Sequence, residues 1–215
     1  DRIKKLTKEY FVPKIYYLKN IFFQSMPISI SICGYSIAAA IIFTYVGISG
    51  EYATAGYGVG TRIEQVVLLP ILGINTAIIT IIAQNFGAQN FQRIKETYTG
   101  AIKYSLIIMV TCSIIVFVFS NNITSIFSSD QTVIEYGGKY LQISAFVLSA
   151  YLIFFLSNGF FMGLKKSEYA MISNLFRNVL NPILVFYFAK LYNASFEQFF
   201  WIWVIINWIF SICYF

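Results

Sequence analysis

Long apolar runs dominate the sequence, and short polar stretches separate them. Each run is long enough for a helix to cross a bilayer, which takes about 20 residues. The pattern predicts six transmembrane helices, at residues 20–49, 52–86, 99–120, 133–164, 169–189 and 196–215. The period-2 alternation of membrane-barrel strands is missing, and the runs are too long for such strands. We therefore expect an all-α membrane protein with one six-helix lobe over residues 20–215.

Composition supports a membrane setting and argues against several classes of function. Hydrophobic residues make up 58% of the chain and charged residues 11%, and the mean hydropathy is +0.70, which lies outside the range of soluble domains. Histidine is absent, which removes His-based catalytic triads and histidine metal sites. Cys33, Cys112 and Cys213 lie in apolar runs without metal-ligand spacing, which favours buried packing over a redox role. We expect neither an enzyme nor a bound metal or cofactor.

The basic residues indicate an orientation in the membrane. When the loops are assigned alternately to two sides, one side carries most of the lysine and arginine, and the other has only Lys139 and Lys190 beside four acidic residues. The positive-inside rule then places both ends of a six-helix unit on the cytoplasmic side of the cell (plasma) membrane. Residues 1–19 are predicted to form a basic, amphipathic segment at the cytoplasmic surface. Because the charges sit in short loops and form no folded basic face, we expect no nucleic-acid partner.

Polar residues that share a helix face indicate a cavity, since water or solute replaces lipid there. Such faces occur on the second, fourth and fifth predicted helices. Their members are Tyr57, Glu64 and Asn75; Tyr140, Tyr151 and Asn158; and Asn174, Arg177, Asn178 and Asn181. Small polar residues in membrane helices also hold neighbouring helices together without any transport role. The pattern leaves both interpretations open.

Arg62 and Glu64 are two charges inside an apolar run, where an ionised side chain is costly. They lie roughly 200° apart around a helix, so they do not form a side-by-side pair. Glu64 shares the face of Asn75, about 20 Å from the outer loop by helix rise. It is either a structural partner for an arginine such as Arg177, or a cation or proton site. Arg62 is expected to have a packing or orienting role, or to snorkel.

Three stretches resemble the second half of the multidrug and toxic-compound extrusion (MATE) transporters. These are "ATAGYGVGTRIEQ" at residues 53–65, "QNFGAQNFQR" at residues 84–93, and "GFFMGLKKSEYAMISNLFRNVLNPILVFY" at residues 159–187. The resemblance covers nearly the whole chain, as helices seven to twelve of twelve. It implies one lobe of a two-lobe transporter whose halves enclose a central cavity.

The resemblance implies a function and its partners. The function is export of small organic cations by alternating access, coupled to Na⁺ or H⁺ entry, with the lipid bilayer and an N-terminal six-helix half as partners. Some branches of the family carry acidic coupling residues in helices seven and ten; here residues 20–50 have no carboxylate, and Tyr151 stands near the tenth-helix position. The coupling-ion site is therefore expected either at Glu64 or in the other half.

Two alternatives remain at this stage. A flippase of the same superfamily, moving lipid-linked saccharide, would need a cationic cavity, and Arg62 and Arg177 are its candidates. A membrane scaffold or pore subunit would need neither a cavity acid nor alternating access.

Overall fold

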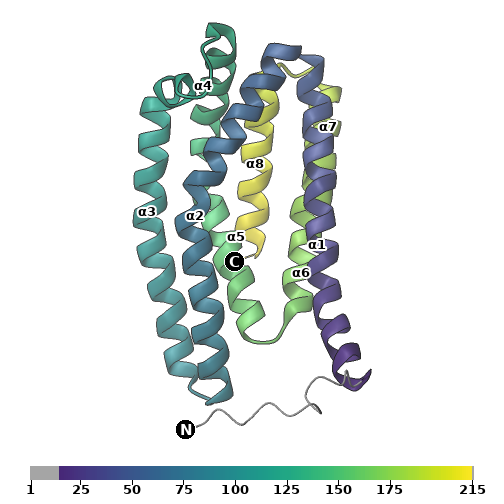
Figure 1. Cartoon of the computed structure of the whole chain (residues 1–215), viewed down its shortest axis with the longest axis vertical. Coiled ribbons are helices and arrows are strands. Elements are labelled where there is room, and N and C mark those ends of the chain that lie inside the picture. The colour runs from purple at the N-terminus through teal and green to yellow at the C-terminus, as the bar shows by residue number, and fades with distance from the viewer. Residues whose placement is uncertain (1–14, 215) are drawn as a thin grey trace, which may run out of the picture.

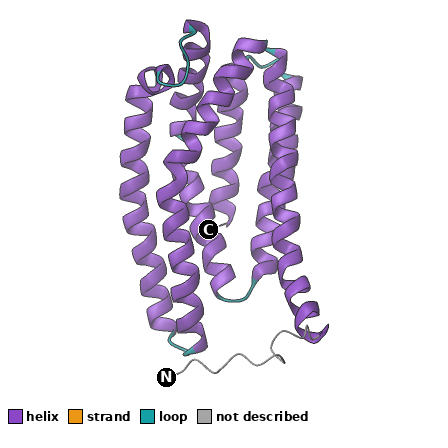
Figure 2. Cartoon of the chain, viewed as in Figure 1, coloured by secondary structure: helices purple, strands orange, loops and turns teal. Residues whose placement is uncertain are grey.

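The computed structural model describes residues 15–214, and nearly all of them are helical (Figure 2). Most of the segment predicted at residues 1–19 therefore lies outside the described residues. The helices are α1 (Ile15–Ile48), α2 (Glu51–Gly87), α3 (Phe91–Ser125), α4 (Gln131–Ala145), α5 (Leu148–Gly163), α6 (Ser167–Leu175), the π-helix η2 (Phe176–Leu180), α7 (Asn181–Leu191) and α8 (Phe196–Tyr214). The expected all-α fold is confirmed.

The helices form two groups that α8 joins. Helix α2 packs against α3, α4 and α5, whereas α1 packs against α6, η2 and α7. Helix α8 contacts both groups, through α7 on one side and through α4 and α5 on the other (Figure 1). By length and composition, three helices in the described part can cross a membrane, namely α2, α3 and α8, and the bent pair of α4 and α5 together makes a fourth. In α1, the described apolar portion is the shorter stretch Cys33–Ile48.

Two of the predicted continuous spans are interrupted. The span predicted at residues 133–164 is two helices, α4 and α5, that meet at an angle of 56°. The indole N–H of Trp208 donates to the carbonyl of Phe146 in this bend at 2.9 Å, which provides a partner for a backbone group next to the break. The span predicted at residues 169–189 contains η2 immediately before Pro182. Proline cannot donate to the carbonyl four residues earlier, so the helix ladder is already broken there.

Glycines bring α2 close to its neighbours. Gly56 meets α4 so closely that a Cβ there would lie 2.8 Å from the backbone nitrogen of Gly137 and 2.9 Å from the carbonyl oxygen of Val133. Gly60, one turn later, packs under the ring of Tyr140. Gly163 on α5 meets Ile82 near the other end of α2 in the same way. Helices in lipid lack a hydrophobic drive to associate, so close van der Waals contact through small residues holds them together.

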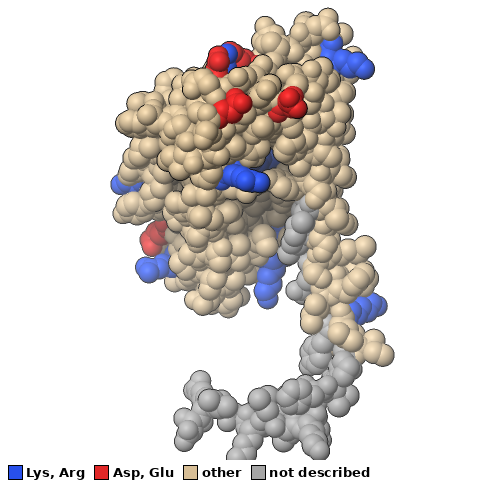
Figure 3. Space-filling view, turned by 45° about the horizontal axis from the view of Figure 1, so that its top comes forward, with Lys and Arg blue, Asp and Glu red and all other residues tan. Residues whose placement is uncertain are grey.

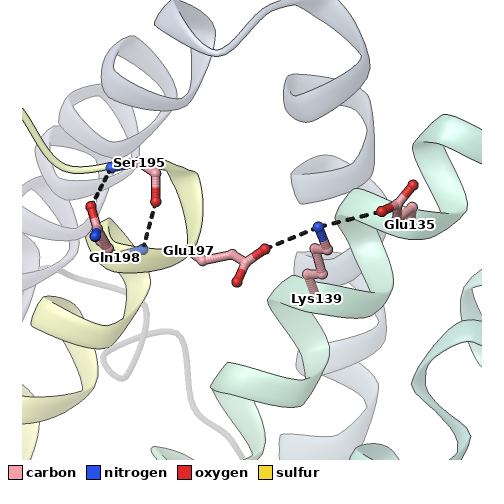
Figure 4. Close-up of polar contacts among 5 residues, drawn as sticks. All are labelled: Glu135, Lys139, Ser195, Glu197 and Gln198. Carbon is pink, nitrogen blue, oxygen red and sulfur yellow. Dashed lines mark hydrogen bonds and ion pairs between the residues drawn. The ribbon is translucent and has the colours of Figure 1, made fainter.

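The ends of the helices carry polar caps and an ion-pair cluster. Ser195 and Gln198 form a capping box before α8: the Ser195 N–H donates to Gln198 Oε1 at 2.8 Å, and the Gln198 N–H donates to Ser195 Oγ at 3.4 Å (Figure 4). Nearby, Lys139 Nζ lies 3.3 Å from Glu135 and 3.0 Å from Glu197 (Figure 4). Lys139 therefore links α4 to α8 at the end of the molecule on which acidic side chains gather (Figure 3).

The glycine contact between α2 and α4 predicts a position-specific effect of one methyl group. Gly56→Ala should lower the stability of the folded protein by about 1–3 kcal/mol, because the new Cβ meets backbone that cannot move aside. Gly58→Ala is the matched control, since a Cβ there meets nothing within 4 Å. Thermal unfolding of the two variants in the same detergent compares them. Equal melting temperatures for the two variants would contradict this account of α2 packing.

Candidate functional site

A cavity of about 510 Å³ lies between the two helix groups. Its walls come from α1, α2, α5, α6, η2 and α8, with one residue from α4. Aromatic side chains form much of the lining, among them Tyr35, Tyr57, Tyr140, Tyr151, Phe200 and Trp203. Two of its lining residues carry a charge, Glu64 and Arg177. The cavity is therefore largely apolar, with one acidic and one basic group.

Glu64 is held inside an aromatic cluster. The carboxylate is buried, and the hydroxyl of Tyr140 donates a hydrogen bond to its Oε2 atom. The ring of Tyr57 lies edge-on to the ring of Tyr140 at 5.0 Å, and Phe200 contacts both rings at 5.4 and 4.8 Å. These contacts fix the hydroxyl that faces the carboxylate, so Glu64 has an ordered donor although it lies in an apolar environment.

Arg177 lines the same cavity and lies against aromatic faces. Its guanidinium carbon is 4.2 Å from the ring centre of Tyr151, 4.2 Å from that of Phe154 and 5.5 Å from that of Phe155. These distances are within the range of cation–π attraction. Arg177 and Glu64 line the same cavity, but no ion pair within 4 Å joins them in the described part of the chain. Aromatic residues therefore contact both charges, and Tyr151 interacts with each of them.

Trp203 ties α8 to this wall. Its indole N–H donates to the hydroxyl of Tyr151 at 3.3 Å. Asn174 and Asn178, on α6 and η2, also line the cavity. The amide of Asn174 donates to Asn158 at 3.4 Å and to the carbonyl of Ala170 at 2.7 Å. Polar groups on this wall are therefore connected to each other and to the backbone.

Comparison with known proteins identifies the family. The MatE family model matches residues 27–187, which is most of the chain. The chain belongs to the MatE family. It is therefore a multi-pass membrane protein of a transporter family, and the resemblance noted in its sequence is confirmed.

Curated relatives of this MatE chain are bacterial transport proteins. The probable multidrug resistance protein YoeA of Bacillus subtilis is 30% identical over 129 residues, which cover 60% of this chain and 27% of that protein. The FAD transporter of Shewanella oneidensis is 30% identical over 107 residues, covering 50% and 24%. The multidrug export protein MepA of Staphylococcus haemolyticus is 25% identical over 168 residues, covering 78% and 37%. The chain thus matches about a quarter to a third of the length of these relatives.

Solved structures show the same fold. A MOP superfamily transporter from Pyrococcus furiosus, described as having a binding pocket of reverse polarity, superposes with a TM-score of 0.88 at 23% identity and covers 98% of this chain and 48% of its own. A crystal structure of MATE in the straight conformation gives a TM-score of 0.87 at 22% identity, with 99% and 48% covered. At this identity the likeness concerns the fold. This chain spans about half of each of these structures.

Three of the polar residues expected on the cavity lie elsewhere in this MatE chain. Asn75 packs against Gly159 of α5, and its Oδ1 atom has no hydrogen-bond partner among the described residues. Asn158 is buried against Asn174. Asn181 is fully buried at the start of α7, and its amide atoms are likewise without a partner within the described part. A shared helix face predicts the direction in which a side chain points around the helix axis. It does not show that α2 packs closely on α5 at the level of Asn75, where no cavity remains between these described helices.

Arg62 does not line the cavity and is exposed on α2. It makes no ion pair with any residue that the structure describes. By helix rise, it lies about 16 Å from the start of α2, near the middle of a hydrocarbon layer about 30 Å thick. Its separation from Glu64 agrees with the opposite faces expected from the sequence, and its role stays a prediction.

Sequence patterns indicated Tyr57, Tyr140 and Tyr151 of the aromatic lining but not Phe200 and Trp203. Tyr140 shares the face of Tyr151, but nothing in the sequence indicated that its hydroxyl reaches Glu64 on another helix. Phe200 and Trp203 belong to α8, where Asn207 and Ser211 share the face of Phe200, but this face was not among those predicted from the sequence. Phe200 and Trp203, which are three residues apart on α8, indicate a cavity wall only once it is known that α8 packs near Glu64.

The Tyr140–Glu64 contact can be tested by a double-mutant cycle. Tyr140→Phe should destabilise the protein by about 1–3 kcal/mol, because it removes a hydroxyl that donates to a buried carboxylate. In a Glu64→Leu background the same substitution should cost much less, since no acceptor remains. Unfolding of the four proteins in one detergent gives the coupling energy. A coupling energy of zero would show that the hydroxyl and the carboxylate do not interact.

Proposed function

We propose that this chain forms one six-helix half of a cation-coupled multidrug exporter and that its 510 Å³ cavity is part of the solute site. The observation that carries the proposal is one buried carboxylate, Glu64, in a cavity walled by aromatic side chains. Aromatic faces attract planar organic cations, and a carboxylate neutralises their charge. The named functions of YoeA and MepA support the same reading.

The size of the cavity suits a small organic solute. Ligand sites commonly measure about 300–1,000 Å³ and combine apolar walls with a few fixed polar groups. Asn174 and Asn178 are among the polar groups that line this cavity. A cavity of this kind favours a transporter over a scaffold that only packs against lipid. A second six-helix half, as in the solved relatives, would close the open side and allow alternating access.

Glu64 is the candidate for ion coupling in this half. A carboxylate that binds H⁺ or Na⁺ in one state and an organic cation in the other makes the two ligands compete for the same negative charge. Competition of this kind couples the entry of one cation to the export of the other. The alternative location for the coupling-ion site is the other half of the complete transporter.

A second candidate solute is an anionic aromatic compound. The relative in Shewanella is named an FAD transporter, and Arg177 supplies this cavity with a positive group beside aromatic rings. A lipid-linked saccharide flippase is less well supported, because a pyrophosphate needs several cations. Arg62 lies outside the cavity, so such a ligand would meet Arg177 alone.

We further propose that the protein lies in the cell membrane with the loops at residues 88–90 and 164–166 in the cytoplasm. Most described basic residues outside the spans flank these loops, including Arg93, Lys95, Lys165 and Lys166. The opposite end carries mostly acidic groups (Figure 3). The positive-inside rule gives this orientation.

Labelling of single cysteines tests the orientation in a cysteine-free background. A membrane-impermeant maleimide should label Ser128→Cys in intact cells, because Ser128 lies in the loop between α3 and α4. It should label Gln89→Cys only after the cells are permeabilised, since this residue lies between α2 and α3. The reverse pattern would invert the proposed topology.

Replacement of the buried carboxylate tests the transport role. Glu64→Gln in the full-length protein should reduce drug resistance at least tenfold, because the amide keeps the shape but carries no charge for a cation. Vesicles with an imposed Na⁺ or proton gradient should show a matching loss of fluorescent-cation transport. Glu96→Gln is the control, since Glu96 is an exposed carboxylate near the start of α3. Normal transport by Glu64→Gln at equal expression would remove Glu64 from the coupling mechanism.

A further inference from the structure

A second cavity, of about 350 Å³, lies beside the central one. Its lining comes from α5, α6, η2 and α8, and includes Tyr169, Ser173, Phe176, Asn207 and Cys213. Several of these side chains are exposed and apolar or aromatic, for example Tyr169 at 49% and Phe176 at 50%. The second cavity therefore borders the outer, lipid-facing surface of these helices.

Arg177 and Phe154 line both cavities. The guanidinium is thus part of the wall between them, and its aromatic contacts are Tyr151, Phe154 and Phe155. Of these three rings, only that of Phe154 lines both cavities. A guanidinium that moved from one cavity toward the other would therefore stay in contact with Phe154. The second cavity also offers polar groups near its floor, since Asn207 and Ser211 line it and are buried.

The backbone that carries Arg177 is irregular. Arg177 is the second residue of the π-helix Phe176–Leu180, and Pro182 follows two residues after its end. A π turn is wider than an α turn and is found mostly as a single turn at functional sites. Because Pro182 has no N–H, the carbonyl of Asn178 lacks the usual helical donor. Conversion between π and α turns therefore requires few hydrogen bonds to break at this position.

The charges of the central cavity lead to a specific problem for a cationic solute. Glu64 and Arg177 are its charged lining residues, so with both ionised the net charge is zero. The guanidinium also occupies aromatic faces, those of Tyr151 and Phe154, that an organic cation would use. A cation that enters must compete with Arg177 for the rings and for the field of Glu64.

We propose that Arg177 is a built-in competitor for cationic solutes and that such a solute binds by displacing its guanidinium toward the second cavity. The inference rests on the proposed function of the central cavity. The guanidinium of Arg177 sets a minimum binding strength for the solute, because a solute must interact with the rings more favourably than the guanidinium does. Arg177 is in this sense a specificity-determining residue, and the second cavity is the space that receives its side chain.

Two lipophilic ions of nearly the same shape and opposite charge provide the test. Purified full-length protein in lipid nanodiscs is titrated with tetraphenylphosphonium and with tetraphenylborate, and the dissociation constants are measured. Arg177→Gln should bind the cation at least tenfold more tightly, because the competitor is gone and Glu64 is unopposed. The same variant should bind the anion more weakly, whereas Arg177→Lys, which keeps the charge, should change the ratio of the two constants much less.

A second pair of variants tests the displacement without changing Arg177. Cys213→Phe places a ring in the second cavity, which should weaken tetraphenylphosphonium binding about tenfold because the guanidinium has less space to enter. Cys33→Phe is the matched control, since Cys33 is also an exposed thiol but lines neither cavity. Both positions are exposed, so both variants are expected to fold.

The outcomes separate this inference from the proposed function. If the unmodified protein binds neither ion, the solute role of the cavity fails. If it binds the cation but Arg177→Gln leaves that affinity within twofold or lowers it, the competitor role of Arg177 is overturned. Equal affinity in Cys213→Phe and Cys33→Phe would overturn displacement into the second cavity.

Discussion

Close contact between α2 and α4 holds the buried carboxylate and its donor in place. Gly56 and Gly60 lie one turn apart on α2, and their missing side chains let the α4 backbone and the ring of Tyr140 approach. Glu64 is one further turn along the same face, where the Tyr140 hydroxyl reaches it. Lipid offers the helices no hydrophobic drive to associate, so this glycine contact positions the hydrogen bond as well as the helices. The geometry of the polar site is therefore a consequence of backbone packing.

The cavity holds two opposite charges of the described chain without a direct ion pair within 4 Å between them, and Tyr151 interacts with both. Glu64 receives a tyrosine hydroxyl, whereas Arg177 lies on the faces of Tyr151 and Phe154. A direct ion pair in an apolar interior would be hard to break without leaving a buried charge unpaired. Without such a pair, each charge keeps neutral aromatic partners. This arrangement fits a site that must bind and release its ligand.

The sequence was informative about helices and about direction around them. Apolar runs predicted helices that the structure shows, and helical offsets named Tyr57, Glu64 and Tyr151, which line the central cavity. The same offsets also suggested Asn75, which lies about three turns farther along α2, where Gly159 of α5 packs against it. Periodicity gives no information on how close the neighbouring helix comes. The aromatic contribution of Phe200 and Trp203 depends on which helices meet, and helical periodicity within α8 does not indicate that.

The two helix interruptions were not predicted from the sequence: the bend between α4 and α5 lies in a continuous apolar run, and the polar residues around Arg177 were assigned to a cavity face. Both nevertheless shape the cavity: the bend between α4 and α5 comes just before Tyr151, and the π turn of η2 carries Arg177 and Asn178. Irregular backbone is tolerated at membrane depth only where protein groups satisfy it or where it lines a polar cavity. Trp208 satisfies the first condition at Phe146, and η2 satisfies the second. The long helix α2 supplies Tyr57 and Glu64 to the cavity, and the broken segments supply Tyr151, Arg177 and Asn178.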